Sequence, residues 1–448
     1  MDYQKHTPFR FHKKLVSEPE EYQLTGFQLE NGLQVIMLKN HQVPVVAVDI
    51  WYKVGSKDEK PGKSGFAHLF EHMMFEGSEN VGKAEHMKLL TDVGGTVNGS
   101  TTQDRTNYWQ VVPANQLELA LWLEADRMRS LKINLENFEN QRATVKEERR
   151  LRIDNQPYMP VIYELKDQIS YRNFAYQHSV MGSMEDLDRA TLEDVTAFHS
   201  LYYRPNNAVM AVVGDFTVQQ AYTLVKKYFS KIPTGAAIPA VDLSESRCQR
   251  EVRFTFPDSF APFPAILISQ LIPERTHSSF YPLELLEKIL FDGESSRFYR
   301  KLVEEEQLAL HVVGGQDGKF GPALFFLFAQ LHPEKKLLDL EKTIYAEFEQ
   351  LQSRGVSEEE LEKAKNKVRT DFVSQQESVR SLADTLCMYH TVYQQPERFF
   401  TELERFEKIT ATEVQAAAKE FLGPDGRSVI EIIPRKQATE ELKPDNLS

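Results

Sequence analysis

Two histidines and a glutamate stand close together within residues 65–77, in the order His68, Glu71, His72. In a helix, positions i and i+4 lie on one face, so His68 and His72 can direct both imidazoles at one metal ion. Glu71 borders that face, where its carboxylate could accept a proton from a water on the metal. The residues around them are apolar on nearly every side, which is typical of a helix that is buried all round.

A carboxylate and two imidazoles in such a helix need partners, because even one unpaired neutral polar group costs on the order of 2–7 kcal/mol to bury. A metal ion would supply that partner. The alternative is that these are satisfied core or cleft side chains that fit a short pattern by chance. A third ligand would favour the metal, and the charged stretch 142–150 offers Glu147 and Glu148. Three protein ligands and one open position for water are typical of catalytic zinc.

The pattern H-x-x-E-H is the signature of the inverted zincins, and the chain resembles the pitrilysin family of zinc peptidases. In that family the third ligand is a Glu about 76 residues after the second His, in a Val-x-x-Glu setting. Glu148 lies 76 residues after His72 and three after Val145. The resemblance therefore selects Glu148 over Glu147. Several members carry a further Glu seven positions earlier, where this chain has Gln141.

Residues 94–109 also resemble the family, and they imply how a substrate binds. By resemblance, a peptide adds as an extended strand beside residues 96–102, so that backbone hydrogen bonds supply affinity with little demand on sequence. Asn98, Gly99 and Ser100 are the expected substrate-binding residues, with Asn98 as the anchor of that edge. The alternative for Asn98 is a plain turn residue, since turns favour Asn-Gly.

The resemblance implies a zinc-dependent endopeptidase with one Zn²⁺ per chain, bound by His68, His72 and Glu148. Glu71 is then the catalytic residue, which accepts a proton from water and passes it to the leaving amine. The alternative is a non-catalytic peptide-binding or scaffold subunit of the same fold, which would need a damaged zinc site. A metal-dependent hydrolase acting on other substrates is a third possibility.

At 448 residues the chain exceeds the size at which one hydrophobic core keeps growing, so we expect at least two domains. The order of motifs recurs along the chain. Residues 190–195 match residues 409–414, and residues 75–77 match residues 291–293. Such recurrence indicates two similar halves. The predicted fold is α+β, with two similar α/β domains that each pack a mainly antiparallel sheet on helices.

The second half has lost the metal ligands, since Glu284 and Lys288 occupy the positions of His68 and His72. Proline, glycine and polar residues between the halves indicate a linker. The predicted organisation is an N-terminal lead-in, a zinc-bearing domain, a linker, a second domain without metal and a C-terminal tail, at residues 1–20, 21–232, 233–250, 251–435 and 436–448.

Family members that complete an active site alone carry an Arg and a Tyr seven residues apart in the second half. The corresponding residues here are Val303 and Leu310. Arg297 and Tyr299 lie nearby in a different register, and we expect them to be structural. In the bacterial two-subunit members, one chain keeps zinc and its partner keeps the Arg/Tyr pair. We therefore expect a heterodimer in which a homologous subunit supplies that pair.

Composition and charge restrict the remaining possibilities. The formal net charge of −13 argues against a nucleic-acid surface, which would be basic. No apolar run approaches the ~20 residues that a membrane helix needs, so we expect no membrane insertion. Cys248 and Cys387 are the two cysteines, and we interpret both as ordinary thiols. We expect a cytoplasmic protein, and a periplasmic one if a signal peptide has been removed.

Overall fold

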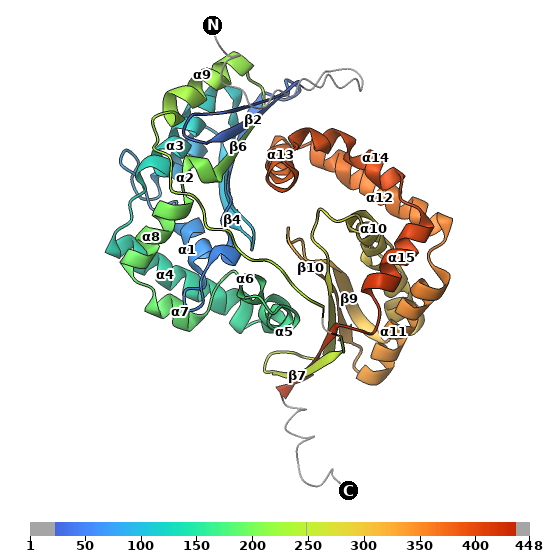
Figure 1. Ribbon diagram of the computed structural model, residues 1–448. Coiled ribbons are helices and arrows are strands. Elements are labelled where there is room, and N and C mark those ends of the chain that lie inside the picture. Colours follow the sequence, from blue (N-terminus) through green and yellow to red (C-terminus); the bar gives the residue numbers. More distant parts are fainter. Residues whose placement is uncertain (1–22, 248, 436–448) are drawn as a thin grey trace. The chain divides into compact units, whose positions relative to one another are not determined.

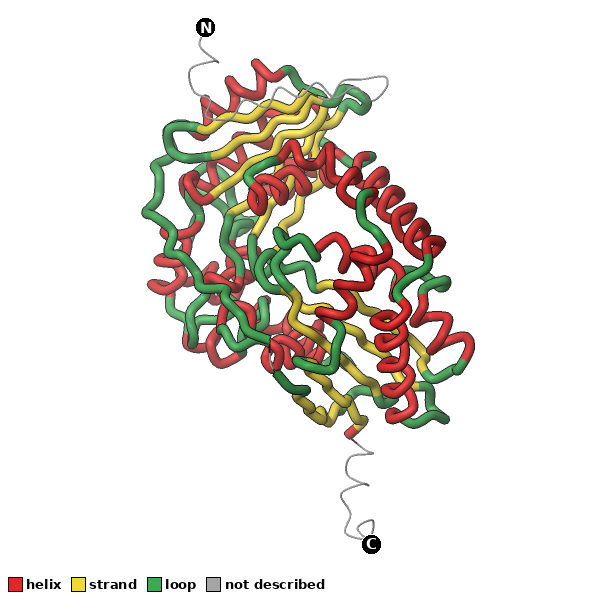
Figure 2. Tube along the Cα trace, turned by 45° about the vertical axis from the view of Figure 1, so that its right-hand side comes forward, coloured by secondary structure: helices red, strands yellow, loops and turns green. Residues whose placement is uncertain are grey.

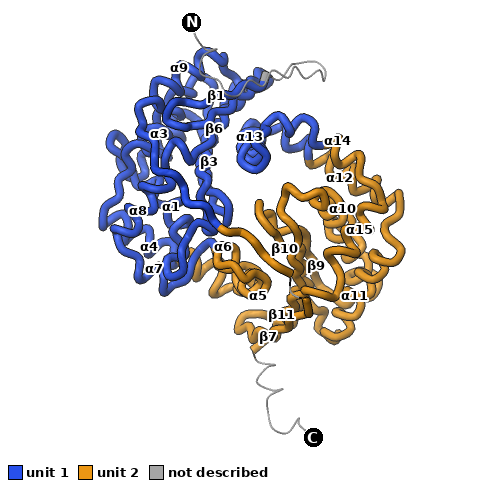
Figure 3. The backbone as a smooth tube through the Cα atoms, in the orientation of Figure 1, with its two compact units in different colours: residues 1–146, 180–241, 372–402 blue, residues 147–179, 242–371, 403–448 orange. Residues whose placement is uncertain are grey.

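The computed structural model describes residues 23–247 and 249–435 (Figure 1). The predicted lead-in, the predicted tail and Cys248 lie outside these residues. The chain forms two compact units, shown in two colours in Figure 3. Of the described residues, the first unit comprises 23–146, 180–241 and 372–402, and the second comprises 147–179, 242–247, 249–371 and 403–435.

The units differ from a simple division of the sequence into halves. One crossing between them, after residue 241, falls inside the predicted linker. In addition, each half of the sequence contributes one segment to the unit formed mainly by the other half, which the sequence prediction did not include. Residues 147–179 join the second unit, whereas residues 372–402 join the first. The domain boundaries predicted from sequence remain predictions, since compact units and evolutionary domains are not the same division.

The first unit contains a six-stranded sheet in which only the β2–β6 pair is parallel. Its strand order is β1 (Gln23–Gln28), β2 (Gln34–Lys39), β6 (Ala208–Gly214), β3 (Val45–Tyr52), β5 (Thr106–Pro113), β4 (Thr96–Thr101). Asn31 and Gly32 form the turn between the first two strands, and Gly32 adopts a φ of +94° that favours glycine. Strand β4 ends the sheet and, among the described strands, pairs with β5 alone, so its other edge has no strand partner there.

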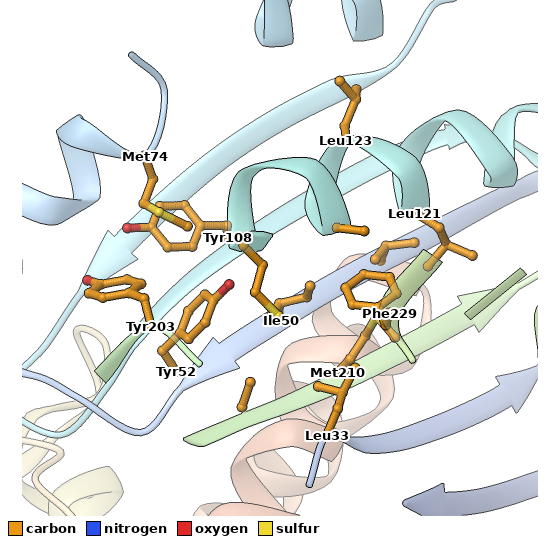
Figure 4. Close-up of a cluster of buried hydrophobic side chains, with 14 of the residues drawn as sticks. Leu33, Ile50, Tyr52, Met74, Tyr108, Leu121, Leu123, Tyr203, Met210 and Phe229 are labelled. Carbon is orange, nitrogen blue, oxygen red and sulfur yellow. The ribbon is translucent and has the colours of Figure 1, made fainter. Parts of the chain in front are cut away.

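Alternate residues of β3 face opposite sides of this sheet. Val48, Ile50 and Tyr52 lie in the main core, where Figure 4 shows Ile50 and Tyr52 beneath helix α3. Asp49 and Trp51 face the other side and contact helix α13. The helices of this unit are α1 (Phe66–Met73), α2 (Glu85–Asp92), α3 (Leu117–Ser130), α4 (Leu135–Arg149, whose last turn is assigned to the second unit), α7 (Met184–Arg189), α8 (Leu192–Tyr202), α9 (Val218–Phe229) and α13 (Val379–Tyr393).

The second unit contains a five-stranded sheet in which only the β7–β11 pair is parallel. Its order is β7 (Val252–Asp258), β11 (Arg427–Pro434), β8 (Ala265–Ile272), β10 (Ala323–Leu331), β9 (Ala309–Gln316). Its helices are α5 (Lys166–Ser170), α6 (Phe174–Gln177), α10 (Phe280–Phe291), α11 (Leu337–Arg354), α12 (Glu358–Gln376, which continues into the first unit), α14 (Glu402–Glu407) and α15 (Ala411–Phe421). Figure 2 shows the strands of both sheets in yellow.

The two sheets share one topology. Strands β7, β11, β8, β10 and β9 follow the order of β2, β6, β3, β5 and β4, including the single parallel pair. Matching capping boxes begin helices α8, at Thr191, and α15, at Thr410. The predicted α+β fold of two similar domains is therefore confirmed. No helix in the described part of the chain has the length and apolar character needed to cross a membrane.

Candidate metal centre

Helix α1 carries both histidines, and a buried carboxylate fixes its N-terminus. The two Glu59 carboxylate oxygens accept hydrogen bonds from the backbone nitrogens of Gly65 and Ala67, each at 2.8 Å. These nitrogens are among the donors that a helix cannot satisfy internally, and a negative charge there also complements the helix dipole. The sequence prediction missed Glu59, because it stands in a segment that reads only as a loop.

The imidazoles of His68 and His72 lie next to each other on α1. Their ring centroids are 5.0 Å apart and the ring planes are at 84°. His68 is buried and His72 is half-buried. The carbonyl oxygen of Phe70, between them in the chain, accepts a hydrogen bond of 2.8 Å from the Tyr108 hydroxyl. This bond ties the middle of α1 to the neighbouring strand β5.

Glu148 lies in the last turn of α4, next to Glu147, and the two side chains differ in exposure. Glu147 has 58% of its side chain exposed and pairs with Arg150 at 3.0 Å. Glu148 has only 18% exposed and pairs with Arg152 at 3.1 Å. The structure brings Glu148 to the histidines, and one ligand atom from each of His68, His72 and Glu148 lies within 4.8 Å of the others.

This donor set fits zinc. Two imidazole nitrogens and one carboxylate oxygen are a known ligand combination of catalytic zinc sites, in which one position stays open. Within the described residues, this is the one group of three His, Cys, Asp or Glu side chains that meets the spacing required of metal ligands. Glu148 stands 76 residues after His72 in the chain, so its convergence with the two histidines is a product of the fold.

Glu71 lies half-buried beside this group. Its charge acts on two buried hydroxyls: burial raises the pKa of Tyr108 and of Tyr203, and Glu71 raises both further. Figure 4 shows these two rings side by side near Met74. Both hydroxyls therefore stay protonated at neutral pH, and the Glu71 carboxylate lies close enough to act on them.

Gln141 occupies the position of the additional Glu found in several family members. Its side-chain amide donates a 2.6 Å hydrogen bond to the Glu76 carboxylate. Glu76 is also paired with Lys83 at 2.8 Å. Gln141 therefore serves to hold the segment that follows α1 against α4.

The register of β4 decides which of its residues face the open edge of the sheet. The Thr102 nitrogen donates to the Arg105 carbonyl oxygen at 2.9 Å. Because bonded and non-bonded pairs alternate in an antiparallel ladder, Ser100 and Asn98 also bond inward, to Asn107 and Trp109. The intervening residues, Val97, Gly99 and Thr101, direct their backbone groups to the open edge.

The three predicted substrate-binding residues therefore differ in what they offer. Gly99 is buried but directs its backbone groups to that edge, whereas Asn98 and Ser100 use theirs within the sheet. The exposed Asn98 side chain accepts a hydrogen bond from the Gly99 nitrogen at 2.9 Å. The Ser100 hydroxyl donates to the Asn107 side chain at 2.7 Å.

The corresponding helix of the second unit, α10, carries no such ligand set. Lys288 pairs with Asp371 at 2.6 Å. Glu287, at the position equivalent to Glu71, accepts a hydrogen bond of 2.9 Å from the Gln316 nitrogen. Burial raises the pKa of Glu287 to about 7.

Val303 and Leu310, at the positions of the Arg/Tyr pair, are both apolar, and they differ in how exposed they are. Val303 packs against the core of the second unit, and Leu310 has 42% of its surface exposed. Arg297 forms a bidentate pair with Glu360, at 2.6 and 2.7 Å. The prediction that Arg297 is structural agrees with that contact.

The duplicated fold and the H-x-x-E-H helix place the chain among the inverted zincins. Residues 34–183 match the family described as insulinase (peptidase family M16), and residues 189–368 match the peptidase M16 inactive domain. The chain is 32% identical over 364 residues to the zinc protease PqqE of Helicobacter pylori, covering 81% of this chain and 82% of that protein. The chain belongs to peptidase family M16, which confirms the resemblance found in the sequence.

Other comparisons agree. A zinc protease of Mycobacterium leprae is 25% identical over 395 residues, which is 88% of each chain. The crystal structure of a protease from Helicobacter pylori superposes with a TM-score of 0.88 at 29% identity, covering 92% of this chain and all of that one. An M16 inactive-domain structure from Pseudomonas fluorescens has a TM-score of 0.81 at 18% identity, with 92% and 98% coverage, and shares the fold.

Proposed function

We propose that this chain is a zinc-dependent endopeptidase whose metal is held by His68, His72 and Glu148. The observation that carries the proposal is the convergence of their ligand atoms to within 4.8 Å of one another. The names of the relatives, which are zinc proteases, support the same metal and reaction class. A scaffold protein would not need this ligand set, so the geometry favours the enzyme.

The residues of the chain have separate roles in this reaction. When bound, zinc supplies Lewis acidity, which lowers the pKa of water and polarises a carbonyl group. Glu71 accepts a proton from the attacking water and returns it to the leaving amine. Glu59 and Tyr108 hold α1 in place, so that Glu71 and the two imidazoles keep their relative positions.

The substrate is a peptide or an unfolded segment that adds to the open edge of β4. Val97, Gly99 and Thr101 offer backbone donors and acceptors there, at the alternate spacing that an added strand requires. The Asn98 side chain occupies the Gly99 nitrogen in the free protein. A substrate carbonyl replaces it, and Asn98 is then released to contact the peptide.

The absence of an Arg/Tyr pair at Val303 and Leu310 supports the second part of the proposal, a division of labour between subunits. A homologous partner subunit supplies the missing polar groups, and this chain supplies the metal centre. The zinc chain alone is then weak or silent as a peptidase.

The test compares the wild-type chain with Glu71→Gln, each alone and mixed with a homologous subunit that carries the Arg/Tyr pair. Both forms should bind one zinc ion per chain, measured by elemental analysis, and only the wild type should cleave an unfolded peptide. Cleavage should increase strongly on mixing. Equal activity with and without the partner would refute the heterodimer, and equal cleavage by Glu71→Gln would refute the assigned role of Glu71.

A further inference from the structure

A buried carboxylate and a half-buried one meet on the face of the first sheet that α13 covers. Asp49 comes from β3 and Asp384 comes from α13, more than 300 residues later. Both accept from the Trp51 indole nitrogen, at 3.3 and 3.2 Å. Both also accept from the Asn107 side-chain amide, at 3.0 and 3.3 Å. Carboxylates that share two donors lie close together, and Asp49 is completely buried.

Arg105 is the cation that faces this pair. Burial lowers the pKa of Arg105, and the charges of Asp384 and then Asp49 raise it. Its guanidinium also lies over the Trp51 ring, 4.9 Å from the ring centroid. Two like charges this close, one of them fully buried, would be destabilising without a cation, because burial removes solvation and the charges repel each other. Arg105 offsets that penalty.

The same guanidinium reaches the edge strand. Its Nη1 donates to the Ser100 carbonyl oxygen at 2.8 Å and to the Ser100 hydroxyl at 2.6 Å. Ser100 in turn donates to Asn107, which binds the two carboxylates. A closed set of contacts therefore runs from α13 through Arg105 and Asn107 to β4, directly beside the residues that form the open edge.

We propose that Arg105 is a positioning residue for the edge of β4, and that α13 takes part in this through Asp384. The part that concerns peptide binding rests on the function proposed above. Among the described strands, β4 pairs on one side only, so its backbone is held less firmly than that of an inner strand. Arg105 adds two charge-assisted hydrogen bonds at Ser100, the residue next to the outward-facing Gly99.

The choice of arginine follows from this geometry. A guanidinium presents several donors in a rigid plane, so one side chain can bind Ser100 and face two carboxylates at once. A lysine has a single nitrogen on a flexible stem and cannot keep both sets of contacts. Arg105→Lys should therefore keep the positive charge near the two carboxylates but hold β4 in place less firmly than arginine does.

The first readout needs no peptide and no metal. Hydrogen–deuterium exchange of residues 96–102 should become at least about tenfold faster in Arg105→Ala, the factor that corresponds to the loss of a hydrogen bond to a charged group. Asp384→Asn keeps the size of the side chain and should still accelerate exchange in β4, although Asp384 is on α13. Arg129→Ala is the matched control, because Arg129 also binds two carboxylates, Glu79 and Asp126, at 2.7 and 2.8 Å.

The second readout is peptide binding in a Glu71→Gln background, followed by cleavage kinetics in the active protein. Arg105→Ala should weaken peptide binding and raise KM by about tenfold or more, with zinc content unchanged and a smaller effect on kcat. Arg105→Lys should fall between the wild type and Arg105→Ala. Arg129→Ala should match the wild type in both assays.

The outcomes separate the two proposals. If β4 exchanges at the wild-type rate in both Arg105→Ala and Asp384→Asn, the positioning role is refuted. If exchange accelerates but no zinc-dependent peptide binding or cleavage occurs in any form, the positioning role stands and the proposed function fails. If Arg105→Ala does not fold, Asp384→Asn and Arg105→Lys decide the matter by the same exchange measurement.

Discussion

Replacement of Glu59 by glutamine should loosen the helix that carries the two histidines. Glu59 is buried, and its two oxygens accept from the nitrogens of Gly65 and Ala67. Glutamine keeps one acceptor oxygen but places an amide NH₂ group opposite the second nitrogen. One charge-assisted hydrogen bond is then lost, the other becomes neutral, and a buried donor is left facing another donor.

The expected cost follows from these contacts. A hydrogen bond to a charged group contributes about 1.5–3 kcal/mol and a neutral one about 1 kcal/mol. The loss of one charged bond and the weakening of the other therefore give a decrease of roughly 2–5 kcal/mol in the free energy of unfolding of the first unit. Since His68 lies in the first turn of α1, zinc affinity should also decrease, by about tenfold to a hundredfold as for other residues that orient metal ligands.

Urea unfolding, followed by exchange-resistant amides of the first unit, measures the stability. Competition with a chromophoric chelator measures the zinc affinity. Glu85→Gln is the matched control, because Glu85 also accepts a backbone hydrogen bond near a helix N-terminus, from Gly82 at 2.7 Å, but is exposed. Its effect should stay below about 1 kcal/mol, since water replaces an exposed contact. If Glu59→Gln costs no more than Glu85→Gln, the account of how α1 is fixed is wrong.

Three further predictions concern charge and packing. Burial lowers the pKa of His199 to about 3. As the pH falls below about 6.5, the unfolded state therefore binds a proton at His199 that the folded state does not, and the protein loses stability. His199→Phe should remove about 2 kcal/mol of the stability loss between pH 6.5 and 4.5, measured by thermal or urea unfolding. Glu148→Gln should weaken zinc binding by calorimetry, whereas Glu147→Gln should leave it unchanged, because Glu147 is exposed and outside the ligand group. Gly315→Ala should lower the stability of the second unit by more than about 1 kcal/mol, because φ is +137° and the added carbon would lie 2.4 Å from the Glu287 carboxyl.

The sequence predicted the parts of the site that depend on periodicity and spacing. His68 and His72 could be placed on one helix face because four residues make about one turn. The choice of Glu148 came from family spacing, and the different exposure of Glu147 and Glu148 agrees with it. The duplicated sheets could likewise be inferred from repeated motifs.

Other features could not be predicted, because they depend on contacts between distant residues. Glu59 has no helix or strand pattern of its own, and its role appears only when its oxygens meet the start of α1. The position of α13 in the first unit has no local signal, so Asp384 could not be paired with Asp49. The turn at Thr102 sets the register of the ladder, and that register decides which residues of β4 direct their backbone groups to the open edge.

The most direct test of the central claim is the zinc K-edge X-ray absorption spectrum of the wild-type protein loaded with one equivalent of zinc. We predict a four-coordinate site with two imidazole nitrogens near 2.0–2.1 Å and oxygen ligands at about 2.0–2.2 Å, from Glu148 and water. A spectrum of hydrated zinc without imidazole scattering, or one with sulfur at about 2.3 Å, would contradict the assignment of His68, His72 and Glu148 as the metal ligands.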